Sequence, residues 1–93
     1  MKWALLWGGE ATLSALGAVC YERNRQDEKW GVQNHDPFLW LGILMEEVGE
    51  VARDLIEMDA FNRPEQFEKY RSELIQVAAV AVAAVECLDR GRA

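Results

Sequence analysis

Several carboxylates recur at helical spacing near the middle of the chain. They are Glu46, Glu47, Glu50, Asp54 and Glu57, with Arg53 as the one cation among them. At about 100° per residue, these side chains share one helix face, opposite a stripe of leucine and valine. Like charges three or four residues apart destabilise a helix by about 0.2–0.5 kcal/mol per pair. The face is therefore either a solvated surface with an excess of acids or a site for a cation.

A second, smaller polar pair lies further along the chain. Glu73 and Gln76 are three residues apart and are flanked by small side chains. If their helix runs antiparallel to the acidic one, they face Glu47 and Glu50 across a helical bundle. Carboxylates from facing helices often build metal sites, and oxygen ligands without His or Cys select Mg²⁺ or Mn²⁺. Glu47, Glu50, Glu73 and Gln76 are therefore the predicted ligands of Mg²⁺, with Mn²⁺ as the other candidate.

Three long helices are expected to position these side chains. The first runs from about Thr12 to Lys29, the second from about Pro37 to Ala60 and the third from about Arg63 to Asp89. Asp36 before Pro37 is a good N-cap followed by a favourable first residue. Asn62 and Glu65 have the spacing of a capping box. No segment has the pattern of a strand, so the predicted fold is all-α.

The apolar pattern predicts which helix faces are buried. Residues at helical spacing form a stripe on the first helix and a longer one on the second, namely Leu13, Leu16, Val19 and Cys20, then Leu41, Leu44, Val48, Val51, Leu55 and Met58. Trp40 is also expected in the core. Residues 77–85 are small and apolar on every face, and such a helix must be covered on all sides. The predicted architecture is a bundle of three long helices per chain, completed by homo-oligomerisation.

Composition limits the class of protein. The 93 residues form one domain (1–93), and residues 1–9 are expected to be an irregular tail. With 16 acidic and 10 basic residues, the net charge of −6 argues against partners such as duplex nucleic acid and an anionic membrane surface. No apolar run approaches the roughly 20 residues of a membrane span, so a cytoplasmic location is expected. Cys20 and Cys87 are expected to be buried free thiols.

From about Glu22 to Arg90, the chain resembles the MazG-like all-α nucleoside triphosphate pyrophosphohydrolases. That family has two Glu, two spacers and a Glu, followed further on by a Glu, two spacers and an Asp. This chain has Glu46-Glu47-Val48-Gly49-Glu50, then 22 residues, then Glu73-Leu74-Ile75-Gln76. The stretch from Arg25 to His35 is similar to the segment that precedes the first motif in many members.

The resemblance implies hydrolysis of a nucleoside triphosphate to a monophosphate and pyrophosphate, often to clear unwanted nucleotides from the pool. It implies that Glu47, Glu50 and Glu73 hold Mg²⁺ and that Glu46 assists them or orients the attacking water. It further implies a substrate site near Trp30, Asn34 and His35, and assembly as a homodimer or homotetramer. Candidates for a triphosphate clamp are Lys29, Arg53, Lys69 and Arg71.

One position departs from the family pattern, because Gln76 stands where the family has Asp. An amide oxygen can bind Mg²⁺ but brings no negative charge, and Asp54 could compensate only if it leans toward the site. The consequence is full activity with altered metal affinity, a narrower substrate range, or a degenerate protein that acts as a helical oligomerisation or interaction module. A related pyrophosphatase that acts on another nucleotide-linked substrate is a further alternative.

Overall fold

The computed structural model describes residues 9–91, and in this part of the chain it contains three α-helices and no strand. They are α2 (Gly9–Trp30), α3 (Pro37–Glu57) and α4 (Pro64–Asp89). The predicted all-α fold is thereby confirmed for the described residues. Residues 1–8, most of the predicted tail, lie outside them. None of the described helices is long and apolar enough to cross a membrane.

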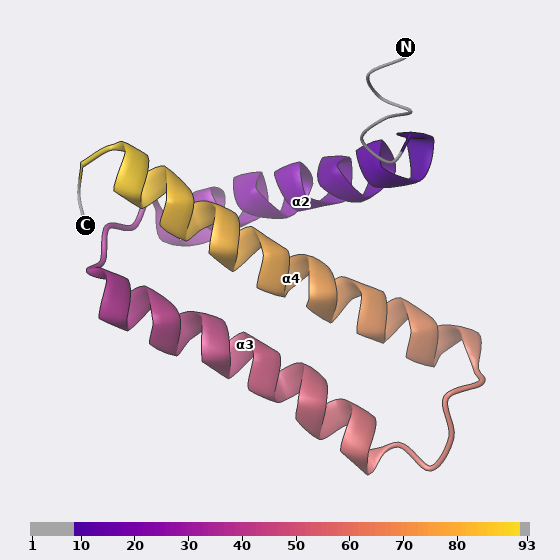
Figure 1. Cartoon of the computed structure of the whole chain (residues 1–93). Coiled ribbons are helices and arrows are strands. Elements are labelled where there is room, and N and C mark those ends of the chain that lie inside the picture. The colour runs from indigo at the N-terminus through magenta and orange to yellow at the C-terminus, as the bar shows by residue number, and fades with distance from the viewer. Residues whose placement is uncertain (1–8, 92–93) are drawn as a thin grey trace.

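Helix α4 lies in the middle of the arrangement. It packs against α2 on one side and against α3 on the other, and α3 and α4 form an antiparallel hairpin (Figure 1). Within residues 9–91, α2 and α3 do not pack on each other. The expected antiparallel pairing of the two acidic helices is therefore present, with α2 added on the far side of α4.

The helix starts follow from local hydrogen bonds. The side chain of Asp36 accepts from the backbone N–H of Leu39 at 2.9 Å, which confirms the predicted cap of α3. At α4, however, the side chain of Gln66 accepts from the N–H groups of both Asn62 and Arg63 at 3.0 Å. The predicted Asn62–Glu65 capping box is wrong by one residue, because the helix begins after Arg63 and its third position is Gln66. Elsewhere, α2 begins three residues earlier and α3 ends three residues earlier than predicted.

A glycine ends α2. Gly31 has a φ of 76°, and its N–H donates to the carbonyl of Asp27 at 2.8 Å. A residue in the left-handed region commonly closes a helix, and glycine adopts that region without a steric penalty from a Cβ atom. Gly31 thus turns the chain out of α2 directly after Trp30.

We expect Gly31→Ala to lower the free energy of unfolding by about 1 kcal/mol, because alanine is strained at this φ. Gly42→Ala is the matched control, since Gly42 lies inside α3 and an added Cβ meets no described atom within 4 Å. There alanine should raise stability by about 0.5–1 kcal/mol through its helix propensity. Urea unfolding of both variants measures the difference, and loss of stability in both would contradict it.

The buried core is small and lies along α4. Trp40 of α3 forms one buried cluster with the α4 residues Val80, Ala83 and Cys87. The partly buried Ile43 and Leu44 of α3 pack against this cluster. Ala79 has no exposed surface at all. The small side chains of α4 permit close approach of the helices on either side. Trp40 and Cys87 are core residues, as predicted.

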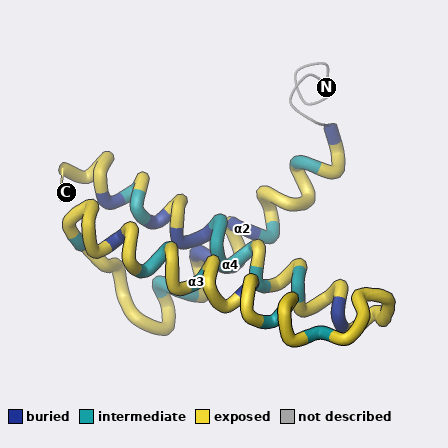
Figure 2. The backbone as a smooth tube through the Cα atoms, turned by 60° about the horizontal axis from the view of Figure 1, so that its bottom comes forward, coloured by how far each residue is buried: buried dark blue, intermediate teal, exposed yellow. Residues whose placement is uncertain are grey.

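Many apolar side chains predicted to be buried are nevertheless exposed in the single chain. On α3, Val51 is buried and Leu44 and Met58 are half-buried, whereas Leu41, Val48 and Leu55 are exposed. On α2, Val19 is buried, but Leu13, Leu16 and Cys20 are exposed. The prediction was wrong for these exposed residues. The amino-terminal half of α2 diverges from the other helices, and α3 touches α4 with one side only (Figures 1 and 2).

Candidate functional site

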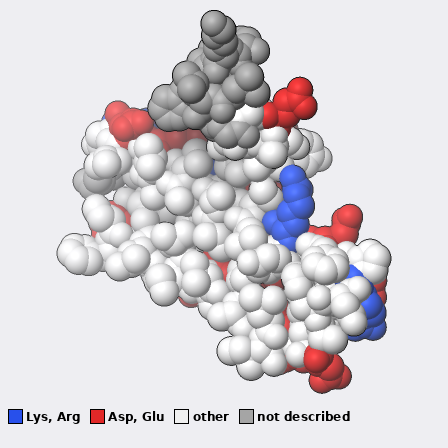
Figure 3. Space-filling view, turned by 45° about the vertical axis from the view of Figure 1, so that its right-hand side comes forward, with Lys and Arg blue, Asp and Glu red and all other residues white. Residues whose placement is uncertain are grey.

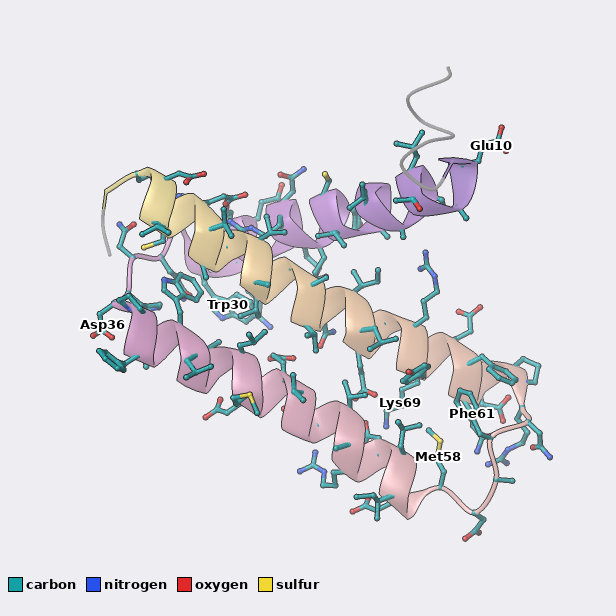
Figure 4. The ribbon with its side chains drawn as sticks, in the orientation of Figure 1. Glu10, Trp30, Asp36, Met58, Phe61 and Lys69 are labelled. Atoms are coloured by element: carbon teal, nitrogen blue, oxygen red, sulfur yellow. The ribbon has the colours of Figure 1, made fainter. Side chains whose placement is uncertain are left out.

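A cleft opens between α2 and α3, and α4 forms its floor. Its volume is about 310 Å³. The α2 wall is polar and includes Glu22, Arg23, Arg25, Gln26 and Asp27, with Trp30 at the carboxyl end of the helix. Trp40, Ile43 and Glu47 contribute from α3, and Gln76, Val80 and Ala83 from α4. In Figure 4, Trp30 lies between the ends of α3 and α4.

The two acidic motifs meet this cleft through one residue each. Glu47 of the first motif and Gln76 of the second both line it. Glu46 and Glu50 are exposed beside Glu47 on α3. Among residues 9–91, no three His, Cys, Asp or Glu side chains stand together as a group that could hold a metal ion.

Glu47 is in an unfavourable electrostatic environment. Burial raises the pKa of its carboxyl, and the negative charges of Glu50, Glu46 and Glu22 raise it further. Glu22 belongs to α2, so carboxylates from both walls act on Glu47. A divalent cation or a proton would relieve this repulsion.

Glu73 lies in a neighbouring cluster instead of the cleft wall. Burial and a hydrogen bond to Asp54 raise the pKa of Glu73, and the same hydrogen bond lowers the pKa of Asp54. Lys69 lies 3.4 Å from the Asp54 carboxylate and extends from α4 toward α3 (Figure 4). Glu50 adds negative charge near Glu73. Asp54 therefore does lean toward the second motif, as the sequence left open, but through Glu73 and not through Gln76.

The three predicted substrate residues are not brought together. Trp30 lines the cleft, half-exposed, with Lys29 Nζ 4.7 Å from its ring centre. Asn34 instead accepts hydrogen bonds from Arg90 at the end of α4, at 2.9 and 3.3 Å. The ring of His35 packs edge-on against Trp40, with the centroids 4.9 Å apart. Asn34 thus ties the α2–α3 connection to the end of α4, and the His35 carbonyl accepts from Sγ of Cys87 in α4 at 3.5 Å.

Two arginines of α2 line the cleft, and neither was among the cations singled out from the sequence. Arg23 is buried and donates to Gln26, Asp27 and Glu86, the last at 2.6 Å, so it ties α2 to α4. Arg25 donates from Nε and Nη2 to the two carboxylate oxygens of Glu22, at 2.9 and 2.8 Å. The i, i+3 spacing of Glu22 and Arg25 is the signal that could have identified this pair.

Two buried donors beside the cleft have no acceptor among the described residues. They are Nε of Arg23 and Nε1 of Trp40, both on side chains that line the cleft. An unpaired buried N–H costs about 1–3 kcal/mol, which natural proteins seldom leave uncompensated. Neither atom is accessible from the cleft, so the donors that the cleft itself offers to a ligand are those of Arg25 and the amide of Gln76.

Comparisons were made with protein-family models, with curated proteins and with solved structures. None of the three found a match.

We expect Glu47→Gln to stabilise the metal-free protein at neutral pH by about 0.2–0.5 kcal/mol for each like-charge contact it removes. Because the pKa of Glu47 is raised by folding, the carboxyl favours the folded state below its ordinary pKa of 4.5 and opposes it as pH rises through the raised value. The difference between variant and wild type should therefore be small near pH 4 and grow toward pH 7. Thermal unfolding in EDTA measures it, and a destabilised variant at pH 7 would contradict the assignment.

Proposed function

We propose that this chain is a MazG-like nucleoside triphosphate pyrophosphohydrolase that depends on Mg²⁺ or Mn²⁺ and releases a nucleoside monophosphate and pyrophosphate. One observation supports this more than any other. Three parts of the motif resemblance, far apart in sequence, contribute to one cleft: Trp30 from the upstream segment, Glu47 from the first motif and Gln76 from the second. A solvated acidic face with no function gives no reason for this convergence.

The donor chemistry of the cleft fits a hard divalent cation. Its candidate ligands carry carboxylate or amide oxygens, which Mg²⁺ and Mn²⁺ prefer. Glu47 would hold the ion with Gln76. Glu50 and Glu73, the other two proposed ligands, lie outside the cleft lining, and the charge of Glu50 acts on both Glu47 and Glu73. When bound, the cation supplies charge neutralisation on the phosphates and activation of water.

The reaction adds water at the α-phosphorus. A bond forms between the water oxygen and phosphorus, the bond to the bridging oxygen breaks, and pyrophosphate leaves with that electron pair while one proton is released. Glu46, exposed next to Glu47, is the side chain proposed to orient the water. Trp30 offers a half-exposed aromatic face on which a nucleobase can stack. Side-chain donors of α2 that line the cleft are proposed to bond with the phosphate oxygens.

We also propose that the active form is a homo-oligomer. A second groove of about 280 Å³ between α3 and α4 is lined almost entirely by apolar side chains. The exposed apolar residues continue along both helices, and include Leu41, Met45, Val82, Val85 and Leu88. In the view of Figure 3, uncharged residues cover most of the surface, and the charged side chains are few and scattered. Contiguous apolar surface of this kind marks interaction sites, and a second copy is the proposed occupant.

The rival proposal is a non-catalytic helical interaction module, which the same exposed apolar surface favours. Ligand-dependent stability separates the two. A bound nucleotide stabilises the folded state by mass action, by about 2.7 kcal/mol at 100 times Kd. For a domain of this size, that raises the unfolding temperature by roughly 10–20 °C. We expect this rise with Mg²⁺ and an α,β-methylene nucleoside triphosphate together. No shift with any of the common bases would favour the interaction module.

A further inference from the structure

The two cleft arginines differ in what they can offer a ligand. Arg23 is buried, and its two terminal nitrogens already bond with Gln26, Asp27 and Glu86. Arg25 is more accessible, with 43% of its side chain exposed, and among the described residues it bonds with Glu22 alone. Arg23 is therefore a structural tie between α2 and α4. Arg25 has donors to spare.

Glu22 and Arg25 form a salt bridge in the wall of the cleft. Glu22 is buried although it is charged, and Gln26 also donates to it, at 3.3 Å. Burying a carboxylate is costly unless it is paired and hydrogen-bonded. The fork geometry of the contact fixes the guanidinium of Arg25 more firmly than a single bond would, and leaves Nη1 outside the contact with Glu22.

The charges in the cleft point to the class of ligand. Asp27 and Glu22 are paired with Arg23 and Arg25, whereas Glu47 forms no salt bridge among the described residues and feels only other carboxylates. A ligand that combines a divalent cation with anionic oxygens offers a partner both to the Glu47 carboxylate and to the remaining donors of Arg25. A nucleotide polyphosphate bound to Mg²⁺ has this composition.

We propose, resting on the proposed function, that Arg25 binds the polyphosphate of the substrate and that Glu22 is the positioning residue that holds it there. Arg25 reaches phosphate oxygens from the α2 wall, opposite Glu47 on α3. Lys29 contacts the ring of Trp30, and Lys69 contacts Asp54. The described lining of the cleft includes none of the four cations singled out from the sequence, namely Lys29, Arg53, Lys69 and Arg71. The phosphate contact of this site therefore comes from the first helix and not from the surface cations of the acidic helices.

Calorimetric titration with inorganic tripolyphosphate in saturating Mg²⁺ tests this without assuming a base. The full chain is compared with Arg25→Gln, Arg25→Lys and, as control, Arg63→Gln, which removes an exposed arginine at the α4 start. We expect Arg25→Gln to weaken binding at least about tenfold, Arg25→Lys to weaken it less, and the control to bind as wild type. Unchanged binding in Arg25→Gln, or equal loss in the control, overturns the proposal.

The positioning role of Glu22 needs a readout that folding alone does not move. Glu22→Gln should raise KM for triphosphate hydrolysis several-fold with kcat nearly unchanged, and Glu22→Asp should restore part of the loss. A lowered unfolding temperature with unchanged KM would make the pair structural and overturn this role. Turnover measured on the same wild-type preparation distinguishes failure of the phosphate site at Arg25 from failure of the proposed hydrolase activity. Without turnover, binding that depends on Arg25 sustains the phosphate site while the hydrolase proposal fails.

Discussion

Glu47→Gln is expected to lower kcat/KM for nucleoside triphosphate hydrolysis by about 10²–10³-fold, the usual cost of removing a charged group that acts on the transition state. Glu47 is the one residue of the first acidic motif among the described residues that line the cleft. Glutamine keeps its shape and removes only the charge. Initial-rate measurements in Mg²⁺ provide the test.

The same substitution is predicted to stabilise the metal-free protein, so lost activity cannot be attributed to unfolding. This opposition between stability and activity is typical of functional sites, where like charges are kept together at a cost. Glu68→Gln, on the exposed face of α4, is the matched control and should hydrolyse as wild type. Equal activity of Glu47→Gln and the control would show that the cleft is not the site.

Trp40→Ala is expected to cost about 3–5 kcal/mol of stability, the usual range for a buried aromatic side chain. Trp40 is 8% exposed and joins α3 to the core residues Val80, Ala83 and Cys87. For a domain of this size, the unfolding temperature should fall by more than about 10 °C. Calorimetry measures this fall.

Trp30→Ala is expected to affect nucleotide binding and not stability, in contrast to Trp40→Ala. Trp30 is half-exposed at the end of α2, so its loss should change stability little and weaken nucleotide binding about tenfold through lost stacking. If Trp40→Ala unfolded no more easily than Trp30→Ala, the core of this fold would be wrongly placed. If Trp30→Ala bound nucleotide as wild type, Trp30 would not contact the base.

Local sequence signals predicted the helices and part of the site. The Asp36–Pro37 pair defined the start of α3 because a cap acts through bonds within one turn. The antiparallel placement of α3 and α4 brought Glu47 and Gln76 to one cleft, whereas Glu73, expected beside them, bonds with Asp54. These features depend on neighbours in sequence or on a hairpin.

The burial of individual apolar residues and the contacts between helices depend on how far the helices extend past one another, which the periodicity of a sequence does not specify. Leu13 and Leu16 have the spacing of a buried face, but no described helix reaches the amino-terminal half of α2. For the same reason, the effect of Glu22 on Glu47 could not be predicted from sequence, because it depends on how α2 packs against α4. Asn34 was assigned to substrate by resemblance, whereas Arg90, 56 residues away, bonds with it.

Analysis of the reaction products tests most directly whether this chain is a nucleoside triphosphate pyrophosphohydrolase. Purified protein is incubated with Mg²⁺ and each common ribo- and deoxyribonucleoside triphosphate, and the products are separated by ion-exchange chromatography. We expect nucleoside monophosphate and pyrophosphate in equal amounts, and neither product with Glu47→Gln. Nucleoside diphosphate and phosphate would place the attack at the wrong bond and contradict the proposed function.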